Sequence, residues 1–445
     1  MISKEEIGKF EGELNSFSST IRENALSELI QLMENGEIIA EQPCEEHNMH
    51  CHTFYSYNGY GYSPSYIAWW TKKHGLFASG IVDFDVLDGA DEFLKSCSKL
   101  NVRGACGIET RVFISELIDK EINSPGEPGI SYHMGVGFQS GDVAPEVKDF
   151  FTSLKKTASD RTREIVKKVN AFLAPVELDF ERDVVPLTPA GNVTERHVCE
   201  AYSTKAEKVF TDNASRAKFW SEKLGVSSDE AGKLILNTVK LQGVIRSKTM
   251  KSGGVGYVKP KPESFPPLKQ MNEFTLKCGG IPVITWLNGE SAGEADPDKL
   301  LELHIKYGAA AINIIPDRNW NLPDPEMKKK RVAELHKIIE ASKKKGLPII
   351  VGTEMNAPGL KLIDDFSSDA LHPYFKDFTD GAAIVFAHSL LQKKGMGYLS
   401  AWATENFRDV FDKNKFFIKA GRKLSPSAWR ETEKLQADEI KKLFR

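Results

Sequence analysis

The sequence lacks the features that mark membrane-spanning and nucleic-acid-binding proteins. Lys and Arg number 59 against 62 Asp and Glu, so the net charge is −3 and there is no basic excess for duplex nucleic acid. The longest apolar runs, such as GLPIIVG, are far shorter than the ~20 residues of a spanning helix and are bounded by Gly or Pro. We therefore expect neither membrane insertion nor extended nucleic-acid binding.

Paired cysteines and a secretion signal are also lacking. The six cysteines are scattered without any CxxC pair. The chain opens MISKEEIGKFEGEL, where no apolar core follows a basic start. We therefore expect reduced thiols and a cytoplasmic protein.

The length and composition predict a large globular fold. A chain of 445 residues allows two or three domains, or one large α/β barrel with an insertion. Apolar residues make up 41% and charged residues 27%, which is enough to bury a sizeable core.

Short β-rich runs alternate with helical segments along most of the chain. Residues 3–35 have apolar positions at helical spacing and predict one or two packing helices that end at Asn35-Gly36. From about residue 48 the expected strands are the segment around His50 and residues 77–85, 102–110, 130–138, 281–289, 310–316 and 347–355. Alternation of this kind favours a parallel sheet or barrel.

A long helical stretch interrupts this alternation. Residues 140–275 are mainly helical and charged, and end in a Gly, Pro and Lys-rich linker over 250–270. The four lysines of the linker could close over an anionic ligand, but a solvated linker is the favoured interpretation. The domain prediction is an N-terminal helical segment 1–47, a discontinuous barrel 48–139 and 276–390, a helical insertion 140–275 and a C-terminal extension 391–445.

His50 and His52 carry the sharpest chemical signal. Residues i and i+2 of a strand project from the same face, so both imidazoles can reach one metal ion, although an exposed or core pair would look the same. Further residues of the ligand type recur near strand ends, which meet at one mouth of a barrel: Asp83, Glu109, His133 and Glu354. Imidazole and carboxylate together suit Zn, Mn or Fe.

Each of these further residues has a structural alternative. Glu109 could form a salt bridge, His133 could be a buried structural histidine, and Asp83 could cap the helix that begins near Gly89. An unpaired Glu354 after the buried run PIIV would be costly.

Seven segments occur in the order of the motifs of one known family. The similar pairs are His50–Thr53 followed by Ser63-Pro64 with HxHT…SP, Val82–Gly89 with TDHDTxxG, Gly107–Glu109 with GxE, Ser131–Phe138 with IHLLGYGF, Thr194–Val198 with GRPHI, Gly280–Leu287 with PVLAHP, and Gly352–Asn356 with GSDFH. The chain thereby resembles the PHP superfamily, named for polymerase and histidinol phosphatase. The resemblance implies a distorted (β/α)7 PHP-type barrel with a helical insertion and a metal-dependent phosphoesterase activity.

The departures from the family pattern reduce the implied metal set. Phe84, Trp286 and Asn356 stand where the family has histidines, and no clear aspartate follows the first motif. The resemblance then implies one site from His50, His52, Glu109 and Glu354, and a second, incomplete one from Glu109 and His133. We expect one or two divalent ions, with Asp83 as a further ligand candidate.

With ions lost, an arginine would have to neutralise the charge of a phosphate, because guanidinium grips phosphate through two parallel hydrogen bonds. Arg196, in the GRPHI-like segment, is the first candidate, and Arg111, on the strand face of Glu109, is the second. His197 could serve as a metal ligand or as the proton donor to a leaving group.

These residues support three functional hypotheses. The first is a metal-dependent hydrolase of a small phosphate ester, such as a nucleotide or a sugar phosphate, whose partner is a small anionic substrate. The second is a catalytically silent barrel of PHP type that binds a ligand or a partner. The third is a barrel that has been adapted to hydrolysis of a substrate without phosphate.

Overall fold

A computed structural model describes residues 2–260 and 264–445 of the chain. Its residues cluster into two compact units. The first unit comprises Met1–Phe54, Asn58–Phe151 and Phe265–Arg445, and the second comprises Tyr55–Tyr57 and Thr152–Ser264. Among the described residues, every helix is too short or too polar to cross a membrane.

The first unit is built on a single seven-stranded sheet whose spatial order equals its sequence order. A bridge between Cys51 and Glu354 brings the far edge of the sheet back to the first strand, so that the barrel is nearly closed. The strands are β1 His47–Cys51, β2 Ala78–Phe84, β3 Arg103–Phe113, β4 Ile130–Phe138, β5 Ile281–Trp286, β6 Ala311–Ile314 and β7 Ile349–Val351. The predicted distorted seven-stranded α/β barrel with a helical insertion is confirmed.

One strand departs from the parallel arrangement that the alternation favours. β4 pairs antiparallel with both β3 and β5, whereas all other pairs are parallel. The connection from β3 to β4 holds only the short turn η1 (Ser115–Leu117) in place of a full helix. Antiparallel neighbours need no helical crossover, which agrees with the lack of a full helix between β3 and β4.

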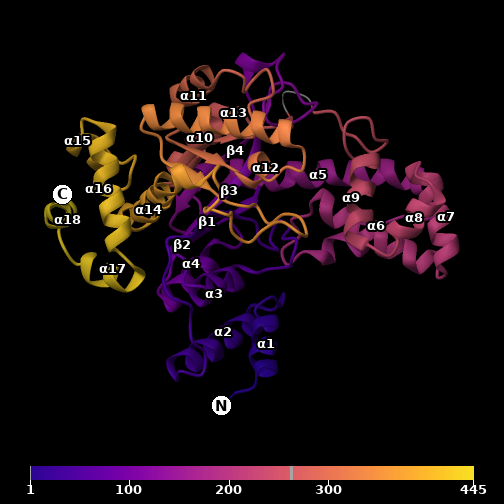
Figure 1. The fold of residues 1–445 in the computed structure, drawn as a ribbon, viewed down its shortest axis with the longest axis horizontal. Coiled ribbons are helices and arrows are strands. Elements are labelled where there is room, and N and C mark those ends of the chain that lie inside the picture. The colour runs from indigo at the N-terminus through magenta and orange to yellow at the C-terminus, as the bar shows by residue number, and fades with distance from the viewer. Residues whose placement is uncertain (1, 261–263) are drawn as a thin grey trace. The chain divides into compact units, whose positions relative to one another are not determined.

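Helices cover the strands on the outside of the barrel. Figure 1 shows α3 and α4 on one side of the strands and α10, α11 and α13 on the other. Local sequence sets where α3 begins, because the Ser63 hydroxyl accepts the Tyr66 N–H and Pro64 occupies the first turn. These helices are α3 Pro64–Lys73, α4 Ala90–Leu100, α10 Leu268–Lys277, α11 Pro297–Lys306, α12 Asp317–Trp320 and α13 Pro325–Lys344.

The helix α14 (Phe375–Leu391) closes one end of the barrel. Every residue from Phe378 to Leu391 is buried, and most of these residues are apolar. Its core partners lie near the amino ends of the parallel strands and at the carboxyl end of β4, among them Ala78, Ala105 and Ile281. The end of the barrel opposite the carboxyl ends of the parallel strands is therefore packed with apolar side chains.

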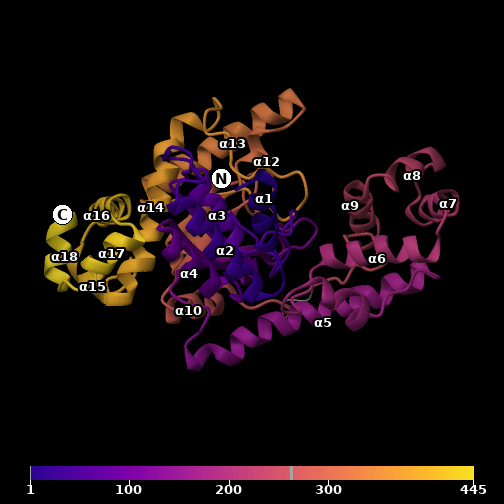
Figure 2. The same cartoon turned by 90° about the horizontal axis from the view of Figure 1, so that it is seen from below.

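The C-terminal helices extend this apolar core. Phe416, Phe417, Trp429, Ile440 and Phe444 belong to the same cluster of buried side chains as α14. Figure 2 shows the four helices gathered beside α14. They are α15 Ala401–Asn406, α16 Val410–Lys423, α17 Pro426–Thr432 and α18 Ala437–Phe444.

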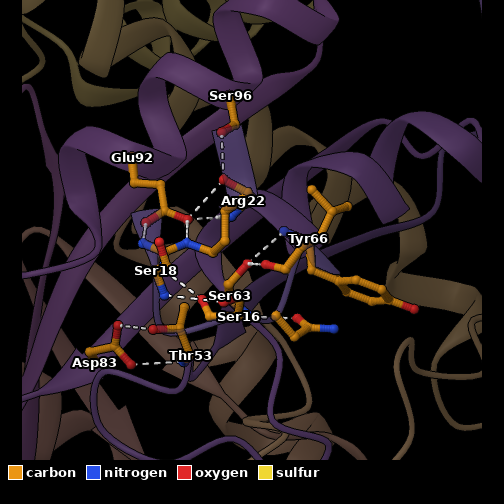
Figure 3. A network of polar contacts seen from close by, with 12 residues as sticks. Ser16, Ser18, Arg22, Thr53, Ser63, Tyr66, Asp83, Glu92 and Ser96 are labelled. Atoms are coloured by element: carbon orange, nitrogen blue, oxygen red, sulfur yellow. Dashed lines mark hydrogen bonds and ion pairs between the residues drawn. The ribbon is translucent and has the colours of Figure 1, made fainter. Parts of the chain in front are cut away.

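The N-terminal helices α1 (Lys4–Glu13) and α2 (Ser19–Glu34) dock onto α3 and α4 through a buried polar network (Figure 3). Arg22 is only 2% exposed and forms a two-pronged ion pair with Glu92, which also accepts the hydroxyl of Ser65. The same guanidinium lies over the ring of Phe54, 5.1 Å from its centroid. A buried arginine held in this way fixes the N-terminal helices to the loop that follows β1.

The second unit is helical and has its own core. Val166, Val169, Tyr202, Trp220 and Ile245 are among its fully or almost fully buried side chains. Figure 2 shows its helices lying together. They comprise most of α5 (Lys148–Leu173), then α6 Glu195–Val209, α7 Asn213–Leu224, α8 Ser228–Leu234 and α9 Thr238–Thr249.

We predict that Gly381→Ala destabilises the first unit. A methyl group at Gly381 in α14 would lie 2.0 Å from the carbonyl oxygen of Ile349, at the start of β7. Overpacking of this kind costs about 1–3 kcal/mol or more, because backbone atoms cannot move aside. Urea unfolding followed by tryptophan fluorescence measures the loss of stability.

Gly8→Ala in α1 is the matched control. Nothing lies within 4 Å of the new methyl group, so stability should be unchanged or rise by up to about 1 kcal/mol. Equal stability of both variants would contradict the packing of α14.

Candidate metal centre

Three of the predicted ligands come together inside the barrel. Nε2 of His50 lies 3.3 Å from Oε2 of Glu109, and Nε2 of His52 lies 3.1 Å from the same oxygen. The three ligand atoms all lie within 4.8 Å of one another, and all three residues are buried. We call His50, His52 and Glu109 the His–Glu cluster.

Strand geometry explains why these side chains converge. Glu109 lies four residues after the core residue Ala105 on β3, so both face the barrel interior, and its register partners are Phe84 on β2 and Met134 on β4. On β1 the register of the pairing with β2 shifts between Asn48 and Cys51, the segment that contains His50. Bulges commonly re-aim side chains next to functional sites.

The donor set fits a divalent ion. In the described part of the chain, neither Nε2 of His50 nor Oε2 of Glu109 makes a hydrogen bond of acceptable geometry, although both atoms are buried. Buried polar atoms of this kind call for a partner. Two imidazole nitrogens and one carboxylate oxygen match the three protein ligands of a catalytic zinc site, which keeps its fourth position open.

The electrostatics of the His–Glu cluster also favour a cation. Burial alone would raise the pKa of the Glu109 carboxyl, but His50 and His52 outweigh burial and lower it to about 2. Burial disfavours a charged His50, yet the attraction of Glu109 raises the pKa of this imidazole. Glu109 is therefore ionised at neutral pH, and its negative charge favours a proton or a metal ion at His50.

Asn313 orients His50 and was missed by the sequence reasoning. Its Nδ2 donates to the carbonyl oxygen of Ile350 at 3.2 Å, which directs its Oδ1 to Nδ1 of His50 at 3.0 Å. Nδ1 of His50 must then carry the proton, so Nε2 presents a lone pair to the cluster. The available signal was a polar residue within the buried apolar run AAINII.

His52 is positioned by its neighbours on β2. Phe84 stacks on its ring, with 4.3 Å between the ring centroids. Asp83 points to the opposite face of β2 and accepts both the backbone N–H and the hydroxyl of Thr53, each at 2.7 Å. Figure 3 includes this contact. The structure thus brings Asp83 to the turn that follows His52, and not into the His–Glu cluster.

Glu354 lies beside the cluster but is held by other groups. Its N–H donates to the His50 carbonyl oxygen at 2.8 Å, and its own carbonyl oxygen accepts the His52 N–H at 2.7 Å. Its carboxylate oxygen Oε2 is bound by the guanidinium of Arg318 and by Nδ2 of Asn356, the latter at 3.0 Å. Glu354 therefore approaches the cluster through its backbone, while its carboxylate faces Arg318.

Arg111 shares the interior face of β3 with Glu109, as the alternation predicts. Nη1 of Arg111 lies 2.9 Å from Oε2 of Glu127, and its guanidinium lies 4.2 Å from the ring centroid of Phe265. Burial raises the pKa of the nearby Asp85 to about 6, against the opposing hydrogen bond of Thr110 and the charge of Arg111. Arg111 is therefore a partly buried cation that already has a carboxylate and an aromatic partner.

The structure does not bring His133 to the cluster. His133 pairs with Thr110, one position from the Glu109–Met134 pair, so its ring projects from the outer face of β4. There Nε2 meets Oδ1 of Asn272 at 2.5 Å, and the ring lies 6.0 Å from that of His304 in α11. The sequence left the register open, and a shift of one residue reverses the face on which a side chain lies.

Arg196 and His197 lie in the second unit, at the start of α6. Nδ1 of His197 accepts the Thr194 N–H at 3.1 Å, which caps the helix, and the ring packs edge-on against Tyr57. Burial lowers the pKa of His197 to about 3. Burial also lowers the pKa of Arg196, with the nearby Arg246 adding to the effect. His197 is thus neutral at pH 7, with Nδ1 already engaged.

Comparisons with known proteins give structural neighbours only. A search of family models and a search of curated proteins found no match. An amidohydrolase from Chromobacterium violaceum aligns at 14% identity and a TM-score of 0.49, over 76% of this chain and 96% of its own. A protein from Bifidobacterium adolescentis, assigned as a metal-dependent phosphoesterase, aligns at 15% identity and a TM-score of 0.48, over 76% of this chain and 98% of its own.

We predict that the chain binds a divalent ion through the His–Glu cluster. His50→Ala should abolish stoichiometric Zn²⁺ or Mn²⁺ binding, and Asn313→Leu should weaken it by about 10–100-fold, because outer partners orient metal ligands. Metal analysis and isothermal titration measure both effects. His74→Ala is the control, because the His74 imidazole pairs with Glu41 and is not part of the His–Glu cluster. Unchanged metal content in His50→Ala would refute the assignment.

We also predict that acid destabilises the barrel through His304. Burial lowers the pKa of His304 to about 3, so the unfolded state binds a proton near pH 6.5 that the folded state excludes. The contribution of His304 to stability should be constant above about pH 6.5 and fall by up to about 1.4 kcal/mol per pH unit below it. His304→Leu should reduce this slope in urea unfolding at pH 7 to 5, since no hydrogen bond to either ring nitrogen occurs in the described chain. The exposed His372→Gln is the control, and an unchanged slope in His304→Leu would contradict the prediction.

Proposed function

We propose that this protein is a metal-dependent hydrolase of a small phosphate ester. The observation that carries the proposal is the convergence of His50 and His52 on one oxygen of Glu109 at the carboxyl ends of parallel strands. Active sites of α/β barrels are built at these ends. An anionic carboxylate beside two imidazoles provides the charge and the ligand types that a catalytic divalent ion needs.

Each residue around the cluster has a defined task in this proposal. An ion held by His50, His52 and Glu109 would supply an activated water, of pKa about 7, and polarise a phosphoryl oxygen. Asn313 holds the tautomer of His50, and Phe84 restricts the ring of His52 by stacking on it. Fixing the ligands before the ion arrives lowers the entropic cost of binding it.

The charge of a bound phosphate requires cations from the protein. Arg111 faces the same interior as Glu109, and Arg318 lies within contact of Glu354. Both are candidates to bind phosphoryl oxygens through parallel N–H donors. The sequence makes Arg196 a third candidate for binding the phosphate. His197 is better suited to donate a hydrogen bond from Nε2 than to transfer a proton, because its neutral form dominates at pH 7.

A second candidate is a catalytically silent barrel that binds a ligand or a partner. It is favoured by the engagement of Glu354, the fourth ligand that the resemblance implies, with Arg318, and by the phenyl ring of Phe84 against His52, where the resemblance implies a histidine. Adaptation to a substrate without phosphate is the third. The first and the third require the metal ion and differ in substrate.

A panel of phosphomonoesters and phosphodiesters, assayed on metal-loaded protein, tests the proposal. We expect turnover of a small phosphate ester in the wild type. Glu109→Gln should lose more than about 100-fold in kcat/KM, since even outer partners of metal ligands contribute about 10–100-fold. Gln is nearly isosteric with Glu, so the fold should persist.

Glu116→Gln is the matched control for this substitution. Glu116 lies just beyond β3, and its partners are Tyr307 and Lys306 instead of the His–Glu cluster. It should keep wild-type activity. Turnover that survives Glu109→Gln would exclude the proposed site, and stoichiometric metal without turnover of any phosphate or non-phosphate ester would favour the binding protein.

A further inference from the structure

The contact between Arg318 and Glu354 connects the barrel rim to the His–Glu cluster. Arg318 belongs to α12, which directly follows β6, and its guanidinium binds Oε2 of Glu354. Nδ2 of Asn356 donates to the same oxygen at 3.0 Å. One carboxylate oxygen of Glu354 is therefore shared by a charged and a neutral donor.

Glu354 is a further carboxylate that the backbone brings beside the His–Glu cluster. Its backbone is hydrogen-bonded to His50 on one side and to His52 on the other, at 2.8 and 2.7 Å. Its side chain is 8% exposed, so its negative charge is almost entirely withdrawn from water. The His–Glu cluster provides three ligand atoms, and Glu354 would provide a further carboxylate ligand. The guanidinium of Arg318 satisfies Glu354 in the absence of a metal.

Arg318 can be reached from solvent, whereas its partner cannot. The side chain of Arg318 is 42% exposed, against 8% for Glu354. A guanidinium offers five N–H donors in a planar fork, and the fork matches carboxylate, sulfate and phosphate. Glu354 is itself an oxyanion bound to this fork, so an incoming oxyanion would compete for donors that already hold one.

We propose that Arg318 withholds Glu354 from the metal centre until an oxyanion binds Arg318 and releases Glu354 to the cluster. This inference rests on the proposed function, because it requires a metal ion at the His–Glu cluster. No bond is made or broken in the exchange; one ion pair is replaced by another. The expected ligand is a tetrahedral oxyanion, of which the phosphoryl group of the proposed substrate is one.

The proposed exchange makes the oxyanion and the metal ion bind cooperatively. An anion that frees Glu354 adds a ligand for the ion, and linkage requires that the ion strengthen anion binding by the same factor. A metal ion would then be held most tightly when a substrate is present. Such couplings typically amount to about 5–150-fold.

Titration of the full-length protein with Mn²⁺, with free Mn²⁺ read by electron paramagnetic resonance, tests the proposal without an activity assay. The titration is done in chloride and in sulfate at equal ionic strength. We expect sulfate to tighten Mn²⁺ binding to the wild type by about tenfold. In Arg318→Gln, Mn²⁺ should bind about tenfold more tightly than to the wild type in chloride, and sulfate should add little.

Two further variants separate the release of Glu354 from a general effect of charge. Lys361→Gln removes a cation from the same rim, where Lys361 pairs with Asp317 at 3.2 Å, and it should behave as the wild type. In Glu354→Gln, sulfate should no longer tighten Mn²⁺ binding. In the double variant Arg318→Gln/Glu354→Gln, the loss of the arginine should no longer tighten Mn²⁺ binding either. If the lost positive charge alone were responsible, Arg318→Gln would have the same effect with and without Glu354→Gln.

Three outcomes would overturn the inference. Arg318→Gln could bind Mn²⁺ no more tightly than the wild type, which would show that Arg318 does not restrain Glu354. Sulfate could act equally on Arg318→Gln, which would place the anion on the metal ion itself. Absence of Mn²⁺ and Zn²⁺ binding in the wild type would overturn the proposed function as well, so the two failures are distinguishable.

Discussion

Two backbone hydrogen bonds between Glu354 and the end of β1 are the constraint on which the site depends. They join the last strand region to the first and fix His50 and His52 on either side of Cys51. Without this closure, β1 would be the open edge of a sheet, and its histidines would have no fixed distance to Glu109 on β3. The same contact delivers the Glu354 side chain to Arg318.

The mouth of the barrel stabilises its carboxylates in three physically different ways. Glu109 lies between imidazoles, which lower its pKa to about 2 against the effect of burial. Glu354 relies on a guanidinium and an amide. Glu294 accepts the N–H groups of the three residues after β5, at 2.7 to 3.0 Å, but burial still raises its pKa to about 7. Of these three arrangements, only the first places a carboxylate of lowered pKa beside two imidazoles, the ligand types that suit a divalent ion.

The sequence was sufficient for the barrel, because strand and helix periodicities alternate strongly and each predicted strand lies within a few residues of an observed one. It also brought His50, His52 and Glu109 together, since strand ends converge wherever parallel strands close. It could not resolve the face of β4, because the reversal of this strand and its register depend on pairing. His133 was therefore expected at the mouth but lies against Asn272.

Residues that act through other residues were the hardest to predict. Asn313 and Arg318 carry no motif, and their importance is visible only from the atoms they contact. Asp83 was expected as a ligand candidate, but its carboxylate serves Thr53, in the turn after His52. The resemblance to the PHP superfamily remains a prediction, as no family model matches the chain.

The buried helix α14 has a consequence for the route of substrate and product. It packs the amino ends of the parallel strands mainly with apolar side chains, among them Ile384, Val385 and Phe386, whereas the His–Glu cluster lies at the carboxyl ends. A polar substrate would therefore enter at the carboxyl ends. If its product left by the same end, release would have to precede the arrival of the next substrate.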